Sequence, residues 1–189
     1  MDSITLLYYL LKQPVDSSTI QYVASAVNSI VHCSAVPITA EISHTLPLLD
    51  NNFVPTVDEF ISHVVASANV GASTLVSTLV YTSRVKARMQ SASRGLCTTP
   101  HRIFLACLIV CAKYLNDRSP RNADWALHSA MSSSRGNFSF SLTEINLMER
   151  QLLRTLDWNM GITMKDLCNQ LETFHAQVLH HLGNLNQPL

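Results

Sequence analysis

Two charged side chains, Lys113 and Glu149, interrupt otherwise apolar helical patterns, where they could form an ion pair or bind a partner. Lys113 ends the run from Ile103 to Ala112, which holds no polar residue apart from two cysteines. Glu149 lies about 40° around a helix from Ile145, at the edge of an apolar stripe. A charge at such a position loses its hydration unless an opposite charge or hydrogen-bonding groups meet it. Lys113 and Glu149 therefore indicate either an internal ion pair or the rim of a binding site.

The two interpretations use the neighbouring apolar residues differently. As an internal ion pair, Lys113 and Glu149 would pin two helices of the same chain together. As a binding site, they would rim a groove that receives a partner's helix or backbone groups, with Leu153 and Trp158 as its apolar floor. An aromatic residue at such a rim is a candidate hot spot, although Trp158 also suits a core position. The residue types alone leave both interpretations open.

No catalytic or metal-ligating pattern accompanies these two residues. The five glycines are scattered along the chain and form no phosphate-binding loop. The eight histidines include no HxxxH pair or other ligand set, and the serines include no GxSxG turn. The sequence therefore predicts a protein that is not an enzyme, needs no cofactor and holds no metal.

The charges cancel over the whole chain but not along it. Thirteen Lys and Arg balance thirteen Asp and Glu in 189 residues. Residues 84–135 hold nine of the basic residues and two acidic ones, a local excess of +7. A solvated loop, the docking of an acidic or phosphorylated protein, and nucleic-acid binding each account for this excess.

The cysteines and the first apolar run bear on the compartment. Five cysteines, an odd number, mostly lie within apolar helical patterns, which predicts buried thiols in a reducing environment. The first apolar run, Ile4 to Leu11, lacks the basic start and the cleavage site of a secretory signal. We therefore expect an intracellular protein.

The longest apolar stretch defines the expected centre of the fold. Residues 101–117, HRIFLACLIVCAKYLND, follow Thr99 and Pro100, which suit an N-cap and a first helical residue. The absence of a turn signal before Asn116 favours a helix over a strand. A helix that is apolar on every side must be buried. Its apolar run is too short for the roughly 20 residues that cross a bilayer, so no membrane span is expected.

Amphipathic helices are expected on both sides of this central helix. Asp16 or Ser18 can cap the first of them, Asn122 can cap a short one, and Ser141 with Glu144 forms a capping box for a later one. The expected spans are 16–31, 55–69, 73–89, 122–131, 141–157 and 164–180. Residues 132–137 are expected to form a loop, and no strand pattern is found.

These helices predict an all-α fold with one main domain. Residues 55–160 are expected to form a bundle of five helices, four of them around the buried central one. Residues 1–54 form an N-terminal helical extension and an irregular, proline-containing crossing, and residues 161–189 form a C-terminal helix and tail.

Several stretches together resemble a known family. HRIFLACLIVCAKYLND, SPRNADWA and LTEINLMERQLLRTLDWNMGI are similar to helices three, four and five of a cyclin box. The stretch PTVDEFISHVVASANVGASTLVSTLVYTSRVK is similar to the first two helices. More narrowly, the chain resembles the fungal Pcl-type cyclins, which activate the cyclin-dependent kinase of the phosphate and G1 pathways. The specific part of the match combines two features. Helix three carries a Lys followed by an aromatic residue, and helix five carries a Glu, with LDW ending nine residues beyond it.

The resemblance implies a regulatory subunit that binds and allosterically activates a cyclin-dependent kinase and helps to select its protein substrates in the fungal cytoplasm and nucleus. In cyclins, the helix-three Lys and the helix-five Glu bind around the kinase αC helix, so that the catalytic Lys–Glu pair of the kinase forms. The resemblance assigns these roles to Lys113 and Glu149. The apolar contacts that it implies are Tyr114, Leu153, Leu156, Trp158 and Met160.

The chain departs from mitotic cyclins where these dock substrates. Mitotic cyclins carry an MRAIL-type segment whose Arg meets an Asp on helix two, whereas here helix one reads VDEFISHVVASAN and Ser83 stands in place of that Asp. We therefore expect substrate docking, if any, to use a basic segment that consists of Arg84, Lys86, Arg88 and Arg94. Two alternatives are a cyclin-fold nucleic-acid adaptor of the transcription factor IIB kind and a scaffold that binds no kinase. Because the chain is neutral as a whole, a nucleic-acid partner is not expected.

Overall fold

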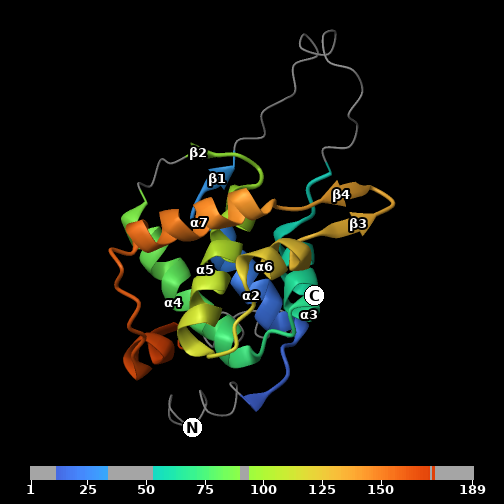
Figure 1. Ribbon diagram of the computed structural model, residues 1–189. Helices are drawn as coiled ribbons and strands as arrows, with labels where there is room; N and C mark the ends of the chain where they lie inside the picture. Colours follow the sequence, from blue (N-terminus) through green and yellow to red (C-terminus); the bar gives the residue numbers. More distant parts are fainter. Residues whose placement is uncertain (1–11, 34–52, 90–93, 171, 173–189) are drawn as a thin grey trace, which may run out of the picture.

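Helix α5 (Thr99–Leu115) is the centre of the molecule, with other helices packed around it (Figure 1). The computed structural model describes residues 12–33, 53–89, 94–170 and 172. Every α5 residue from Phe104 to Ala112 is buried. The elements that pack against α5 are α2 (Ser17–Asn28), α3 (Val57–Ser67), α4 (Ala72–Arg88) and α7 (Leu142–Thr155). The predicted helical architecture around a buried central helix is confirmed.

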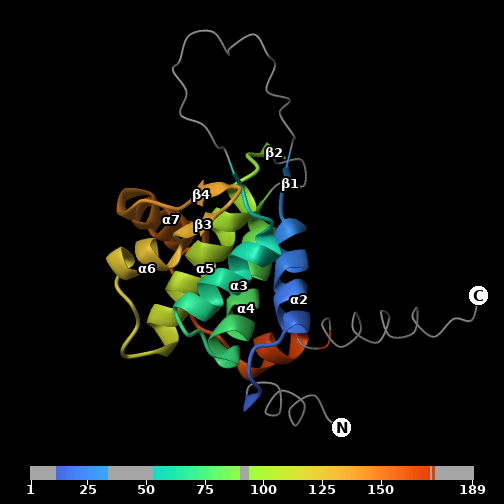
Figure 2. The ribbon, with the colours of Figure 1, turned by 90° about the vertical axis from the view of Figure 1, so that its right-hand side faces the viewer.

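The surrounding helices lie on opposite sides of α5. Figure 2 shows α5 between α7 on one side and α2 on the other. The short helix α6 (Asn122–His128) packs against α3 and α7. Helix α2 contributes Val23 and Val27, both fully buried, to the same hydrophobic core as the helices that follow. The helix expected in the N-terminal extension is therefore part of the packed structure.

Capping boxes fix where two of the helices begin. At the start of α7, the Ser141 Oγ accepts from the Glu144 backbone N–H at 3.3 Å, and the Glu144 carboxylate accepts from the Ser141 backbone N–H at 3.0 Å. That backbone bond is the main reason why the pKa of Glu144 lies below its usual value. Thr56 and Glu59 make the equivalent pair of bonds before α3. The predicted cap of α7 is confirmed, and Asp16 caps α2 as one of its two predicted caps.

Some helix boundaries differ from those expected. The N-cap of α5 is Thr98, so Pro100 occupies the second helical position and not the first. Helix α6 begins at Asn122 itself, after Arg121, whose backbone N–H donates to the Asp124 carboxylate at 2.9 Å. It also ends at His128, before the expected end at residue 131. The predicted cap role of Asn122 was wrong, and its side chain is used elsewhere.

Short strands are present, so the expectation of no strand was wrong. Strand β1 (His32–Cys33) pairs in parallel with β2 (Arg94–Gly95). Strand β3 (Met131–Ser133) pairs antiparallel with β4 (Gly136–Phe138), inside the region expected to be a loop. Strands of two or three residues are too short to show a repeating alternation of apolar and polar residues. Gly136 has a φ of 137°, a backbone conformation in which glycine is favoured.

A buried histidine joins the start of α5 to the segment before α3. The Nε2–H of His101 donates to the Pro55 carbonyl at 2.8 Å. Its ring packs against the rings of Phe60 and Phe138, with centroids 5.3 Å away in each case. Because burial disfavours the charged imidazolium, the pKa of His101 lies below 6.5.

Several expected segments extend outside the described residues. The C-terminal helix is described for residues 164–170 and at residue 172, and the rest of its expected span is not described. The apolar run from Ile4 to Leu11 and most of the irregular crossing also lie outside the described residues. In the described part of the chain, Cys107 and Cys111 are buried within α5, where burial raises the pKa of each thiol to about 12.

Candidate functional site

Lys113 and Glu149 meet where the end of α5 packs against the middle of α7. The Lys113 Nζ donates to the Glu149 Oε1 at 2.6 Å. The same ammonium donates to the Asn122 Oδ1 at 2.7 Å. The side chain of Lys113 is 35 % exposed and that of Glu149 17 % exposed, so the pair faces the surface without being fully hydrated. The two charges singled out in the sequence thus form one site.

An asparagine completes this site from a third helix. The Asn122 Nδ2, at the start of α6, donates to the Glu149 Oε2 at 2.6 Å and to the Asn146 Oδ1 at 2.7 Å. Both oxygens of the Glu149 carboxylate are therefore engaged by groups of the same chain. This contact holds the carboxylate in one orientation, although a carboxylate offers about four lone-pair sites and can accept further bonds. No sequence pattern singles out Asn146, and Asn122 was expected only to cap a helix.

The apolar residues that the resemblance groups with the charged pair differ in their exposure. Tyr114 follows Lys113 on α5 and is 50 % exposed, and Trp158 follows α7 and is 70 % exposed. Leu153 lies one helical turn after Glu149 on the same face of α7, and both Leu153 and Met160 are partly buried. Tyr114, Leu153, Trp158 and Met160 are thus accessible in part.

Leu156 is placed differently from the other predicted contacts. Its side chain is fully buried in the core, so a partner cannot reach it in this conformation. The helical stripe that carries it, with Ile145, Met148 and Leu152, faces α5 and the rest of the core. Leu156 therefore supports the site from beneath and is not part of its surface.

The backbone after α7 adopts an unusual conformation that carries Trp158. The Trp158 N–H donates to the Leu153 carbonyl and the Asp157 N–H to the Arg154 carbonyl, both at 3.0 Å. These bonds form a Schellman motif, in which the residue after the cap adopts a left-handed conformation and is usually Gly. Here Asp157 has a φ of 51° and Trp158 a φ of 59°. Left-handed conformations at non-glycine residues cost on the order of 1 kcal/mol each and persist where surrounding contacts hold them.

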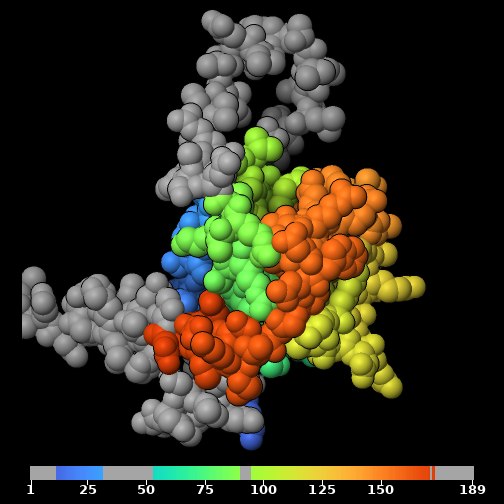
Figure 3. All heavy atoms as spheres, turned by 90° about the vertical axis from the view of Figure 1, so that its left-hand side faces the viewer, coloured from blue at the N-terminus to red at the C-terminus, as the bar shows by residue number. Residues whose placement is uncertain are grey.

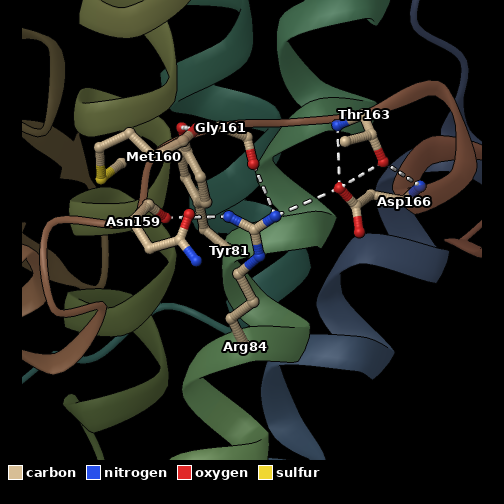
Figure 4. A network of polar contacts seen from close by, with 7 residues as sticks. All are labelled: Tyr81, Arg84, Asn159, Met160, Gly161, Thr163 and Asp166. Carbon is tan, nitrogen blue, oxygen red and sulfur yellow. Dashed lines mark hydrogen bonds and ion pairs between the residues drawn. The ribbon is translucent and has the colours of Figure 1, made fainter.

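The basic residues considered for substrate docking have separate partners. Arg84 binds the segment after α7, as Figure 4 shows, through bonds to the Asn159 carbonyl at 3.0 Å and the Gly161 carbonyl at 2.7 Å. Lys86 donates to the Ser29 Oγ at 2.9 Å. Arg88 pairs with Asp157 at 3.1 Å, and Arg94 lies in β2. Substrate docking by this cluster stays a prediction, and Arg84 also binds the segment after α7.

The surface around α4 and α7 shows how the segment after α7 is seated. Figure 3 shows this segment, in red, against α4 in green and the end of α7 in orange.

Within the described ranges, no cluster of His, Cys, Asp and Glu has the composition of a metal site. No helix within those ranges is long and apolar enough to cross a bilayer.

A known family matches most of the sequence. The family model described as cyclin, N-terminal domain, matches residues 32–161. The chain therefore belongs to the cyclin family, whose members are regulatory subunits and not catalytic ones. This result confirms the family predicted from the sequence and the prediction that the chain is not an enzyme.

The chain is also similar to three PHO85 cyclins of one yeast strain. The chain is 35 % identical over 166 residues to PHO85 cyclin-1 of Saccharomyces cerevisiae (strain ATCC 204508 / S288c). The aligned residues make up 88 % of this chain and 56 % of that protein. It is 33 % identical over 171 residues to PHO85 cyclin-9 of the same strain, with 90 % and 51 % covered. For PHO85 cyclin-2, the identity is 34 % over 163 residues, with 86 % and 48 % covered. The chain spans about half the length of these curated relatives.

Proposed function

We propose that this chain binds and allosterically activates a cyclin-dependent kinase of the kind for which its relatives are named. The observation that carries the proposal is the partly exposed Lys113–Glu149 pair, oriented by Asn122. The proposed contact residues, here called the docking surface, are Lys113, Tyr114, Glu149, Leu153, Trp158 and Met160. Charged groups with partly exposed apolar neighbours suit the reception of a helix or of backbone groups from another protein.

The chain acts in this proposal through differential binding alone. A partner shifts a conformational equilibrium only by as much as it prefers one state over the other. If the docking surface binds the kinase αC helix better in its active position, binding brings together the Lys–Glu pair that the kinase needs for phosphoryl transfer. The substrates are then proteins phosphorylated by that kinase, in the cytoplasm and nucleus.

Charge reversal at Glu149 tests the docking surface directly. We expect Glu149→Lys to abolish co-purification with the kinase, because it places two ammonium groups together and removes a carboxylate from the interface. Disruption of a desolvated interfacial charge typically costs about 2–5 kcal/mol, a loss of roughly 30-fold or more in affinity. The measurement is a pull-down with the kinase, accompanied by circular dichroism to show that the helices remain. A complex that survives this change would remove Glu149 from the site.

A charge swap separates binding from a purely internal role. The double variant Lys113→Glu with Glu149→Lys keeps one positive and one negative charge in contact but exchanges their positions. If the pair served only to hold α5 against α7, the double variant would recover kinase binding that either single variant loses. We expect no recovery, because the kinase would meet each charge with the wrong sign. Recovery to the wild-type level would support the internal ion pair and count against this docking surface.

A further inference from the structure

The segment after α7 is held against α4 by one arginine. The Arg84 guanidinium donates to the Asn159 and Gly161 carbonyls and also pairs with Asp166 at 3.2 Å, as Figure 4 shows. Its side chain is 21 % exposed, so these bonds form in a partly dehydrated place. A planar guanidinium presents several N–H donors in fixed directions and can bridge groups from different parts of a chain. Arg84 thus ties three positions of the segment to a single point on α4.

A second residue of α4 supports the same segment. The Tyr81 hydroxyl donates to the Met160 carbonyl at 2.8 Å, between the two carbonyls that Arg84 binds. Burial raises the pKa of Tyr81, so its hydroxyl remains a donor throughout the physiological range. Asp166 is itself held by the Thr163 backbone N–H at 2.8 Å, the first cause of its lowered pKa. Successive carbonyls at 159, 160 and 161 are therefore all bound by α4.

These bonds begin one residue after Trp158. Trp158 and Asp157 have left-handed backbone conformations, and most of the Trp158 side chain is exposed. An exposed side chain has few packing contacts that could hold its own backbone in a strained state. The Schellman bonds and a bond from the Asn159 N–H to the Leu156 carbonyl at 2.9 Å hold the backbone locally around Trp158. The bonds from Arg84 and Tyr81 attach the carbonyls of residues 159–161 to α4. The aromatic end of the docking surface thus depends on contacts made by α4.

We propose that Arg84 is a positioning residue that acts with Tyr81 to hold Trp158 and Met160 in the arrangement that the kinase recognises. This inference rests on the proposed function, and it gives Arg84 a role other than the substrate docking suggested by its charge. Arg84 is not expected to touch the kinase. Its loss should therefore loosen the segment in the free chain and weaken kinase binding only through Trp158 and Met160.

The free chain offers a direct test. With 5-fluorotryptophan incorporated, Trp125, which is 1 % exposed, and Trp158 give two fluorine resonances that a Trp158→Phe variant assigns. We expect Arg84→Gln to shift or broaden the Trp158 resonance and to leave the Trp125 resonance unchanged. Lys86→Gln is the matched control, because Lys86 lies on the same helix but donates to Ser29 of the α2 C-terminus. A Trp158 resonance that is the same in Arg84→Gln and in the wild type would overturn the inference.

Tyr81→Phe keeps the test decisive if Arg84→Gln unfolds. This variant removes the bond to the Met160 carbonyl and retains the buried ring. It should change the Trp158 resonance in the same direction, with a smaller effect than Arg84→Gln, while circular dichroism stays the same. If the Trp158 resonance is unchanged in every one of these variants that stays folded, Arg84 and Tyr81 do not position Trp158.

Kinase binding provides the second readout. We expect Arg84→Gln to weaken binding about tenfold, the magnitude associated with lost hydrogen bonds to a charged group. In a Trp158→Ala background the same change should weaken binding less than it does in the wild type, because only its effect through Met160 remains and the effects of coupled residues do not add. Equal losses in the two backgrounds would show that Arg84 does not act through Trp158. If the wild type binds no cyclin-dependent kinase, the proposed function fails, whereas the fluorine spectra still decide whether Arg84 holds the segment.

Discussion

At the scale of single residues, the exposure of Lys113 and Glu149 limits what their ion pair does within the chain. Exposed or half-exposed ion pairs contribute about 0–1 kcal/mol to stability. The pair retains partial access to solvent, mainly through Lys113, whose side chain is 35 % exposed, whereas that of Glu149 is 17 % exposed. Its contribution to folding is therefore small beside that of the buried core of α5. The more consequential property of the pair is its fixed orientation, which Asn122 provides.

His101 makes the stability of the fold depend on pH. It is buried and neutral, and its pKa is lowered from 6.5 by burial. An unfolded chain binds the proton more readily than the folded one does, so the contribution of His101 is fully present above about pH 6.5. It is lost as the pH falls from there through the folded-state pKa. We expect the free energy of unfolding to decrease between about pH 7 and pH 5.

His101→Gln tests this origin of the pH dependence. The glutamine amide can still donate to the Pro55 carbonyl, and it does not titrate. We expect the variant to lose less stability than the wild type between about pH 7 and pH 5, as measured by urea denaturation at each pH. Equal slopes for the two proteins would assign the pH dependence to other groups.

The sequence identified the main residues of the site but not all of their partners. Lys113 and Glu149 stood out because charges inside apolar patterns need an explanation, and the structure brings them together. Asn122 and Asn146 carry no such signal, since polar residues at helix surfaces are ordinary. Arg84 belonged to a basic cluster, and its carbonyl partners became visible only when the segment after α7 was placed in space.

At the scale of elements, the turn that ends α7 is both strained and well bonded. Asp157 occupies the position that usually carries Gly in a Schellman motif, with a φ of 51°. Among the described residues, its side chain pairs with Arg88 alone, and this exposed ion pair adds little to stability. The Asp157 side chain therefore does not offset the free-energy cost of the left-handed backbone at this position.

Asp157→Gly should consequently stabilise the chain. We expect an increase of about 0.5 kcal/mol in the free energy of unfolding, because glycine adopts the left-handed conformation without a steric penalty. Asp157→Ala is the control, since it loses the same pair with Arg88 but keeps the strain. Urea denaturation should rank the glycine variant above the wild type and the alanine variant below it. An alanine variant as stable as the glycine variant would show that the backbone at residue 157 is not strained.

The helices were more predictable than the strands for a physical reason. A helix such as α7 can be predicted from its cap, Ser141 with Glu144, and from an apolar stripe that repeats over several turns. Strands β1 and β2 are two residues long and join parts of the chain about sixty residues apart, as in the pairing of His32 with Arg94. Their pairing depends on how α2, α4 and α5 pack, and no local sequence pattern encodes it.

At the scale of the whole molecule, the basic middle of the sequence is largely neutralised in space. Within the residues that the structure describes, six of the nine basic residues in 84–135 form ion pairs, five of them with acidic residues from outside that stretch. These pairs are Arg84–Asp166, Arg88–Asp157, Arg102–Glu144, Lys113–Glu149, Arg121–Asp124 and Arg135–Glu59. An excess of +7 along the sequence is thus not an equal excess on the surface, which weakens the case for nucleic-acid binding.

Salt dependence distinguishes the two kinds of partner. Binding through six to ten phosphate contacts would lose about 10³–10⁵ in affinity between roughly 50 and 200 mM salt. We expect the kinase complex to weaken by less than about tenfold over that range, because apolar contacts supply much of its binding. Fluorescence anisotropy with labelled kinase, and with a labelled oligonucleotide as the comparison, measures both. Tight oligonucleotide binding with a steep salt slope would favour the nucleic-acid adaptor.

The position of α2 bears on how a recombinant fragment of this protein should be cut. The family match begins at residue 32, after α2 has ended, although Val23 and Val27 of α2 are fully buried against the rest of the molecule. The match also ends at residue 161, short of Asp166. A fragment trimmed to those limits would expose the apolar surface of α3 and α4 that α2 covers. Such an exposed apolar surface promotes aggregation. Expression vectors should therefore start upstream of Asp16 and continue beyond residue 170.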